Sequence, residues 1–169
     1  MSNSKPTTNS IDGIIFDLDG VLADSEYLVN QIEVKIKNKF GLSITIEEQV
    51  DQFVGLAIND PIMIEELKRL PDNYWELVDQ KKESLFKTEL NTTSNARELL
   101  QKLNKPMSVA SNSEAYWLDF KLKVLELDHF FPNAIFSREL VKQGKPAPDL
   151  FWYAAKEMSV DPKNCLVVE

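Results

Sequence analysis

From Asn91 onward, short apolar segments rich in β-branched residues alternate with longer amphipathic segments. In chain order we expect a helix at 96–103, a strand at 107–110, a helix at 115–127, a strand at 134–136, a helix at 149–158 and a strand at 166–168. Such alternation predicts βαβ units, and therefore a mainly parallel sheet with helices on both faces. Because ligands of such sheets bind beyond the carboxyl ends of the strands, polar residues that follow the apolar segments are the site candidates.

One more buried strand is expected at residues 11–16, where an apolar, β-branched run stops abruptly at Asp17-Leu18-Asp19-Gly20. Two carboxylates would then lie at the C-terminal end of a strand. Hydrolysis of a phosphate monoester requires a nucleophile and a proton donor, and Asp17 and Asp19 can divide these two roles. Asp and Gly are also common turn residues, so the tetrapeptide taken alone favours a plain turn.

The segment between this strand and Asn91 has the pattern of helices. An apolar stripe at spacings of three and four predicts a first helix that ends at Gly41, with Val29, Ile32, Ile36 and Phe40 on its buried side. Thr45 followed by Glu48 predicts a capping box at the start of a second helix. The apolar face of this second helix would comprise Val50, Phe53 and Val54, up to Gly55. Further helices are expected at 62–70 and 75–86.

These patterns predict a domain organisation with an insertion. We expect an α/β core formed by 11–25 and 91–169, interrupted by an all-α cap at 26–90, and a disordered Ser/Thr/Asn-rich tail at 1–10. The segment Phe53-Val54-Gly55-Leu56 of the cap is a candidate substrate-facing loop, and it equally suits ordinary packing at a helix end.

Two further polar segments follow expected strands. Ser111 and Asn112 come at the end of the strand at 107–110, where a hydroxyl and backbone N–H groups leading into a helix can cradle a phosphate. Taken alone, Ser111 also suits a helix cap. Lys145 lies between Gly144 and Pro146, and by itself it is compatible with an ordinary surface lysine.

Charge and cysteine content restrict the class of protein. The formal net charge of −8 argues against a nucleic-acid footprint or a membrane-surface patch, since both need clustered cations. A single cysteine, Cys165, excludes an intramolecular disulfide. The first ten residues lack the apolar stretch of a signal peptide, so we expect a cytoplasmic protein.

The string IIFDLDGVLADSE at 14–26 resembles the first motif of haloacid dehalogenase-like phosphatases almost residue for residue. Three more motifs of this family follow in order, namely SVASNS at 108–113, GKPAPD at 144–149 and LVVE at 166–169. The resemblance implies subfamily I of this superfamily, with a Rossmann-like parallel-sheet core and a helical cap. The chain is most similar to sugar-phosphate phosphatases of the branch that includes phosphogluconate phosphatases and β-phosphoglucomutases.

The resemblance also implies a mechanism and a cofactor. A Mg²⁺-dependent phosphatase of this kind would attack phosphorus with Asp17, forming an aspartyl-phosphate, while Asp19 protonates the leaving alcohol and later activates water. By the same resemblance Ser111, Asn112 and Lys145 bind the phosphoryl group, and the metal ligands are Asp17, Asp19 and Glu169. The expected partner is a small phosphorylated metabolite.

Other functions stay open at this point. The presence of Asp19 disfavours dehalogenation, and Val29 stands where the resembling mutases carry a hinge histidine, so hydrolysis is favoured over a phosphomutase. The family's acidic pair continues past Glu169, so we expect the C-terminal part of the core to be missing here. An inactive fragment or a non-catalytic binding module is the remaining alternative. A monomer is expected, or a dimer through the exposed face of the truncated sheet.

Overall fold

The computed structural model describes residues 10–54, 56 and 60–169. The predicted tail therefore lies outside the described residues except for Ser10, and so does Gly55 of the candidate substrate-facing loop. The chain divides into two compact units, a core unit of Met1–Ala23 with Asn91–Glu169 and a helical unit of Asp24–Leu90.

The core unit contains one parallel sheet, which confirms the predicted α/β class. Its four strands are β1 (Gly13–Phe16), β2 (Met107–Ser111), β3 (Ile135–Ser137) and β4 (Cys165–Val168), in the order β3-β2-β1-β4. Register pairs Phe16 of β1 with Val109 of β2 and Val168 of β4. The carboxyl ends of these strands therefore meet at one edge, where Asp17, Ser111 and Glu169 lie at or just beyond the strand ends.

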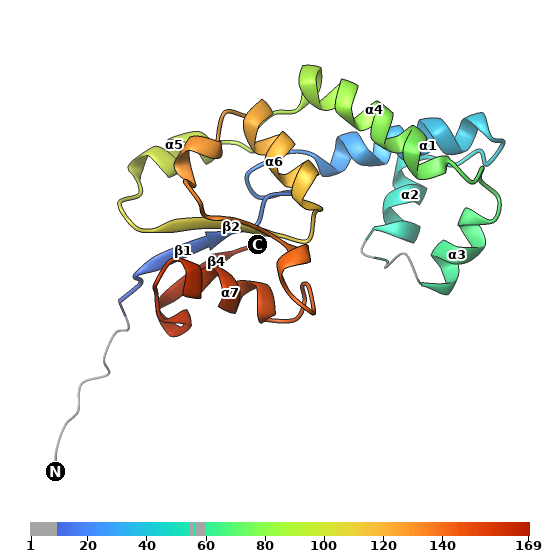
Figure 1. The fold of residues 1–169 in the computed structure, drawn as a ribbon. Helices are drawn as coiled ribbons and strands as arrows, with labels where there is room; N and C mark the ends of the chain where they lie inside the picture. The colour runs from blue at the N-terminus through green and yellow to red at the C-terminus, as the bar shows by residue number, and fades with distance from the viewer. Residues whose placement is uncertain (1–9, 55, 57–59) are drawn as a thin grey trace, which may run out of the picture. The chain divides into compact units, whose positions relative to one another are not determined.

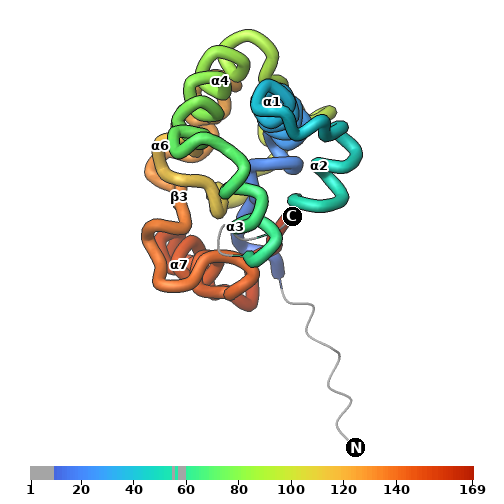
Figure 2. The backbone as a smooth tube through the Cα atoms, turned by 90° about the vertical axis from the view of Figure 1, so that its right-hand side faces the viewer, coloured from blue at the N-terminus to red at the C-terminus, as the bar shows by residue number. Residues whose placement is uncertain are grey.

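Helices cover both faces of this sheet. The core unit has α5 (Ala96–Lys102), α6 (Ala115–Val124) and α7 (Asp149–Glu157), together with the short 3-10 helices η1 (Asp128–Phe130), η2 (Arg138–Leu140) and η3 (Pro162–Asn164). Helices α5 and α6 lie on one side of the sheet and α7 on the other (Figure 1). Strand β3 lies between α6 and α7, and contacts both (Figure 2).

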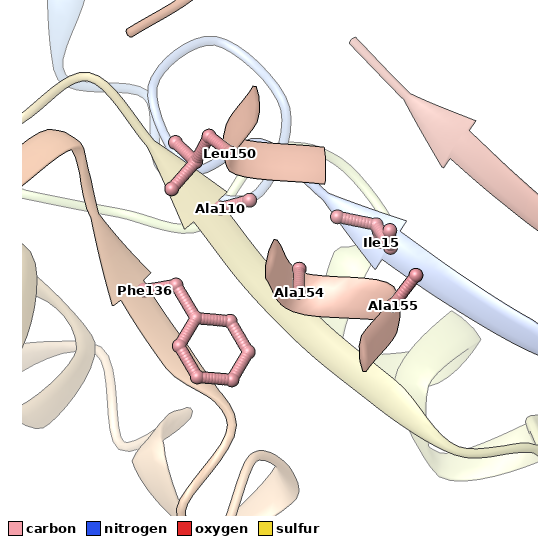
Figure 3. Packing of buried hydrophobic residues seen from close by; sticks show 6 residues of the cluster. All are labelled: Ile15, Ala110, Phe136, Leu150, Ala154 and Ala155. Atoms are coloured by element: carbon pink, nitrogen blue, oxygen red, sulfur yellow. The ribbon is translucent and has the colours of Figure 1, made fainter. Parts of the chain in front are cut away.

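Helix α7 packs on the sheet through small and branched side chains (Figure 3). The buried cluster consists of Ile15, Ala110, Phe136, Leu150, Ala154 and Ala155. The two alanines let the helix backbone approach the strands closely. Full burial of a side chain such as Leu150 stabilises the folded state by about 2 kcal/mol. This packing therefore helps to hold together the sheet that carries the candidate site.

Strand β4 forms an edge of the sheet, next to β1. Its apolar residues Leu166 and Val167 are 43% and 37% exposed. This edge is therefore less enclosed than β1 and β2, whose Ile15 and Val109 are almost fully buried.

The helical unit contains α1 (Glu26–Lys39), α2 (Ile46–Phe53), α3 (Pro61–Leu67) and α4 (Tyr74–Glu89). Helices α1 and α4 pack against each other, and the buried apolar cluster there consists of Ile32, Ile36, Tyr74 and Val78, with Leu70 from the segment between α3 and α4. None of the helices in the described residues is both long enough and apolar enough to cross a bilayer.

The capping box at the start of α2 is confirmed: Thr45 Oγ1 accepts from the Glu48 amide at 3.1 Å, and the Glu48 carboxylate accepts from the Thr45 amide at 2.8 Å. The predicted apolar face of this helix is wrong in part. Val50 and Val54 are 42% and 51% exposed, and the residue buried beside Phe53 is Gln49. Phe40, placed on the buried stripe of the first helix, is 46% exposed because it follows the last residue of α1.

Gln49 is buried because it belongs to a polar cluster inside the helical unit, named here the Lys37 cluster: Glu33, Lys37, Gln49, Glu66 and Tyr74. The Lys37 ammonium donates to Gln49 Oε1 at 2.9 Å and lies 3.4 Å from a Glu66 oxygen. Glu33 accepts from Gln49 at 3.0 Å and from the Tyr74 hydroxyl at 3.2 Å. Each of the four helices thus contributes at least one side chain to this network.

Candidate active site

Asp17 is held at the end of β1 by its backbone and its side chain. Its amide donates to the Val168 carbonyl at 2.9 Å, which joins the end of β1 to β4. Its Oδ1 accepts from the Leu18 amide at 2.7 Å. The Asp17 side chain remains 22% exposed, so the carboxylate is fixed in direction and still accessible.

Lys145 brings Asp17 and Glu169 together. Its ammonium nitrogen lies 3.0 Å from Asp17 Oδ2 and 3.0 Å from Glu169 Oε1, with only 9% of the lysine side chain exposed. The Phe151 ring lies beneath it, 5.2 Å from nitrogen to centroid. Within the part of the chain that the structure describes, this ammonium makes ion pairs but no hydrogen bond of suitable angle. It can therefore still donate to a further acceptor.

Asn112 determines where Lys145 lies. Its Oδ1 accepts from the Lys145 amide at 2.9 Å, and its Nδ2 donates to the Lys145 carbonyl at 3.0 Å. The side-chain amide thus pairs with the Lys145 backbone on both sides. A Cβ at position 144 would lie 2.6 Å from Asn112 Oδ1, so glycine allows this amide to approach the Lys145 backbone without a shift of the Asn112 side chain.

Asp19 belongs to a second group, named here the Asp19 cluster: Asp19, Ser111, Ser113 and Lys121. Lys121 forms a short ion pair with Asp19 Oδ1. Ser113 Oγ donates to Asp19 Oδ2 at 2.8 Å, and Ser111 Oγ donates to the same oxygen at the longer distance of 3.5 Å. The residues predicted from the first two motifs are therefore adjacent.

Sequence reasoning missed Lys121 and Ser113. Lys121 lies on the buried face of α6 together with Trp117, Leu118 and Leu122. A lysine within an apolar stripe at helical spacing was the available signal, because a buried ammonium needs an anionic partner. The pattern could not show that this partner is Asp19.

The donor chemistry of the site suits a hard divalent cation in part. Asp17 and Glu169 both approach Lys145, and their carboxylate oxygens are the ligand type that Mg²⁺ prefers, with water or substrate oxygens filling the other positions. The predicted ligand set of Asp17, Asp19 and Glu169 is not assembled as one group. Among the described residues, no three His, Cys, Asp or Glu side chains are arranged to hold a metal, and the Asp19 carboxylate pairs with Lys121 instead.

Comparison with known proteins identifies the family. The family model described as haloacid dehalogenase-like hydrolase matches residues 14–169. This range includes Asp17, Lys145, Glu169 and the Asp19 cluster. The chain belongs to this family. The resemblance stated from the four motifs is therefore confirmed, together with the α/β core that it implied.

Individual relatives of this haloacid dehalogenase-like chain include phosphatases. A 6-phosphogluconate phosphatase of Escherichia coli is 32% identical over 163 residues, which cover 94% of this chain and 74% of the relative. A phosphorylated carbohydrates phosphatase of Thermotoga maritima is 26% identical, covering 94% of this chain and 76% of the relative. A solved HAD family hydrolase of Deinococcus radiodurans, with phosphate and sodium bound, is 27% identical with a TM-score of 0.77, covering 94% of this chain and 72% of that one.

Proposed function

We propose that this chain is built for Mg²⁺-dependent hydrolysis of a small phosphate monoester, in particular a sugar phosphate, through an aspartyl-phosphate intermediate. The observation that carries the proposal is the buried Lys145 ammonium, placed 3.0 Å from the Asp17 carboxylate at the end of β1. A carboxylate cannot approach a phosphate dianion unless nearby cations reduce their mutual repulsion. Lys145 provides such a cation at the nucleophile itself.

In the first step, an Asp17 oxygen forms a bond to phosphorus, and the bond from phosphorus to the alcohol oxygen breaks. The alcohol oxygen keeps the bonding electron pair and takes a proton from the Asp19 carboxyl group. In the second step, a water oxygen attacks phosphorus, Asp19 accepts a proton from that water, and Asp17 leaves as a carboxylate. Phosphate and alcohol are released, and both aspartates return to their initial states.

Ser111 and Lys145 are suited to bind the phosphoryl oxygens, because each presents a donor close to an aspartate of the first motif. Asn112 was predicted to bind the same group. Since its amide pairs with the Lys145 backbone on both sides, we assign it mainly to holding Lys145 in place.

Mg²⁺ would be held by the carboxylates of Asp17 and Glu169. When bound, it supplies positive charge beside the transferring phosphoryl group. With Asp19 protonated for the first step, the two negative charges of Asp17 and Glu169 only balance the two positive charges of Lys121 and Lys145, so an added cation is needed once substrate binds. A phosphate dianion would add two further negative charges.

The proposed substrate class comes from the relatives, which are named as phosphatases of 6-phosphogluconate and of phosphorylated carbohydrates. The helical unit is proposed to serve as the cap that selects among such substrates.

The test is release of inorganic phosphate from a panel of sugar phosphates that includes 6-phosphogluconate, with Mg²⁺ and with chelator. We expect Mg²⁺-dependent turnover by the wild-type chain and none by Asp17→Asn. During turnover, acid quenching followed by mass spectrometry of the peptide that contains Asp17 should show a phosphoryl adduct. Binding of these esters without turnover would instead support a non-catalytic binding module, and an adduct on another residue would exclude Asp17 as the nucleophile.

A further inference from the structure

Both oxygens of the Asp19 carboxylate are held by donors from α6 and the loop before it. Lys121 pairs with Oδ1, and Ser113 Oγ donates to Oδ2 at 2.8 Å. The Lys121 ammonium also donates to Ser113 Oγ, at 3.1 Å. The three side chains therefore form a closed triangle, in which movement of any one disturbs both of its neighbours.

Exposure within the triangle is unequal. The Lys121 side chain is 5% exposed, whereas that of Asp19 is 25% exposed. Lys121 lies on the buried face of α6, beside Leu118 and Leu122. Its ammonium therefore contacts the Asp19 carboxylate from the protein interior. The accessible part of Asp19 is left at the edge where the strands end, on the same side as Asp17.

We propose that Lys121, together with Ser113, is a positioning residue that fixes the Asp19 carboxylate for proton transfer to the leaving alcohol. This inference rests on the proposed phosphatase function. An aspartate side chain has two rotatable torsions and can adopt several orientations. A displacement of about 1 Å at a reacting group lowers the rate about a hundredfold. Contacts to both oxygens restrict Asp19 to one orientation.

A positioning role through Asp19 predicts a dependence on the leaving group that general structural damage does not. The alkoxide of a sugar leaves poorly without a proton, whereas para-nitrophenolate leaves readily without one. Loss of Asp19 orientation should therefore slow the sugar phosphate far more than para-nitrophenyl phosphate. A variant that merely loosens the core should slow both esters alike.

The experiment compares Lys121→Met and Lys121→Arg with Lys123→Met. Lys123 is a matched control because it lies on the same helix with 63% of its side chain exposed, and it pairs with the surface residue Asp119. We expect Lys121→Met to lower kcat on the sugar phosphate about 10- to 100-fold and on para-nitrophenyl phosphate less than about threefold. Lys121→Arg should recover part of the loss, and Lys123→Met should match the wild type on both esters.

A second variant covers the case in which Lys121→Met fails to fold. Ser113→Ala removes only one hydroxyl from the triangle and should show the same selective loss on the sugar phosphate, in smaller degree. Adding Lys121→Met to Asp19→Asn should lower kcat no further, since both changes act on the same proton transfer. Equal losses on the two esters, or additive losses in the double variant, would overturn the positioning role.

Failure of the underlying function would be recognised separately. If the wild-type chain hydrolyses neither ester, the proposed phosphatase is wrong and the positioning role falls with it. The ion pair itself can still be measured through melting temperatures. Coupling of Lys121 and Asp19 should make the shift in the double variant smaller than the sum of the two single shifts.

Discussion

Lys37 in the helical unit and Lys121 in the core unit are both buried lysines paired with carboxylates, and they differ in what surrounds the pair. Lys37 and its partner Glu66 are 1% and 9% exposed, and both lie inside the Lys37 cluster. Lys121 is equally enclosed, but its partner Asp19 is 25% exposed at the ends of the strands. The Lys37–Glu66 pair is enclosed, whereas the Lys121–Asp19 pair is open to solvent on the side of Asp19.

Burial shifts the pKa values of the groups in the Lys37 cluster. Burial lowers the pKa of the Lys37 ammonium and raises the pKa of the Glu33 carboxyl, in each case against the attraction of opposite charges nearby. Burial also raises the pKa of the Tyr74 hydroxyl. Such a network acts on stability and on unique packing of the helices, whereas an open network can act on a substrate. Substitutions in the two places should therefore separate stability from activity.

The largest effect is expected for Lys145→Met, at the carboxyl ends of the strands in the core unit. Asp17 and Glu169 would face each other without the cation between them, so kcat/KM for a sugar phosphate should fall about a thousandfold. Steady-state phosphate release measures this. Lys142→Met, an exposed lysine three residues earlier, is the control. A decrease of less than about tenfold would mean that Lys145 does not act on the phosphoryl group.

The closed network should respond in stability instead. Lys37→Met removes the buried cation beside Glu66 and leaves the exposed Arg69, 3.2 Å from its other oxygen. Breaking a buried pair in this way lowers the free energy of unfolding by about 3 kcal/mol. Urea unfolding measures this change, with the exposed Lys35→Met on the same helix as the control. If kcat on para-nitrophenyl phosphate drops while stability holds, the contrast between the two networks is wrong.

A smaller, mixed effect is expected for Asn112→Ala. This change removes both hydrogen bonds to the Lys145 backbone, and should lower the free energy of unfolding by about 1–2 kcal/mol and kcat about tenfold. Asn104→Ala, an exposed asparagine before the same strand, serves as the comparison. Unchanged kcat with lowered stability would show that Lys145 keeps its place without this support.

The smallest effect concerns pH. The raised pKa of Glu33 means that the folded state holds its proton more tightly than the unfolded state, so this contribution to stability is present at acidic pH. It is lost as pH rises through the folded-state pKa. Glu33→Gln removes this dependence, so its melting temperature relative to the wild type should rise from pH 4 towards pH 7. A difference that stays constant with pH would show that Glu33 does not titrate as proposed.

Much of the core unit follows from local pattern. The alternation after Asn91 predicted each α-helix and strand to within a few residues, although not the three short 3-10 helices. The burial of a parallel strand between two helical layers shows directly in its apolar run. The order β3-β2-β1-β4 did not follow, since strand pairing depends on contacts between distant segments.

The same limit explains which polar residues were found and which were missed. Asp17, Asp19, Ser111, Lys145 and Glu169 all follow strands or lie in recognisable motifs. Lys121 and Asp19 are 102 positions apart, so nothing near Lys121 in sequence indicates its partner. The burial of Gln49 was not predicted for a similar reason, because it depends on Lys37 and Glu33 of another helix.

The close approach of Asn112 to the Gly144 backbone links two positions that the sequence separates by 32 residues. A side chain at 144 would collide with the same amide oxygen that holds Lys145. In a combinatorial library that randomises both positions, tolerated residues at 144 should depend on the residue at 112. A residue larger than glycine at 144 should be selected only where position 112 no longer carries a side-chain amide, so the two positions should covary as a pair.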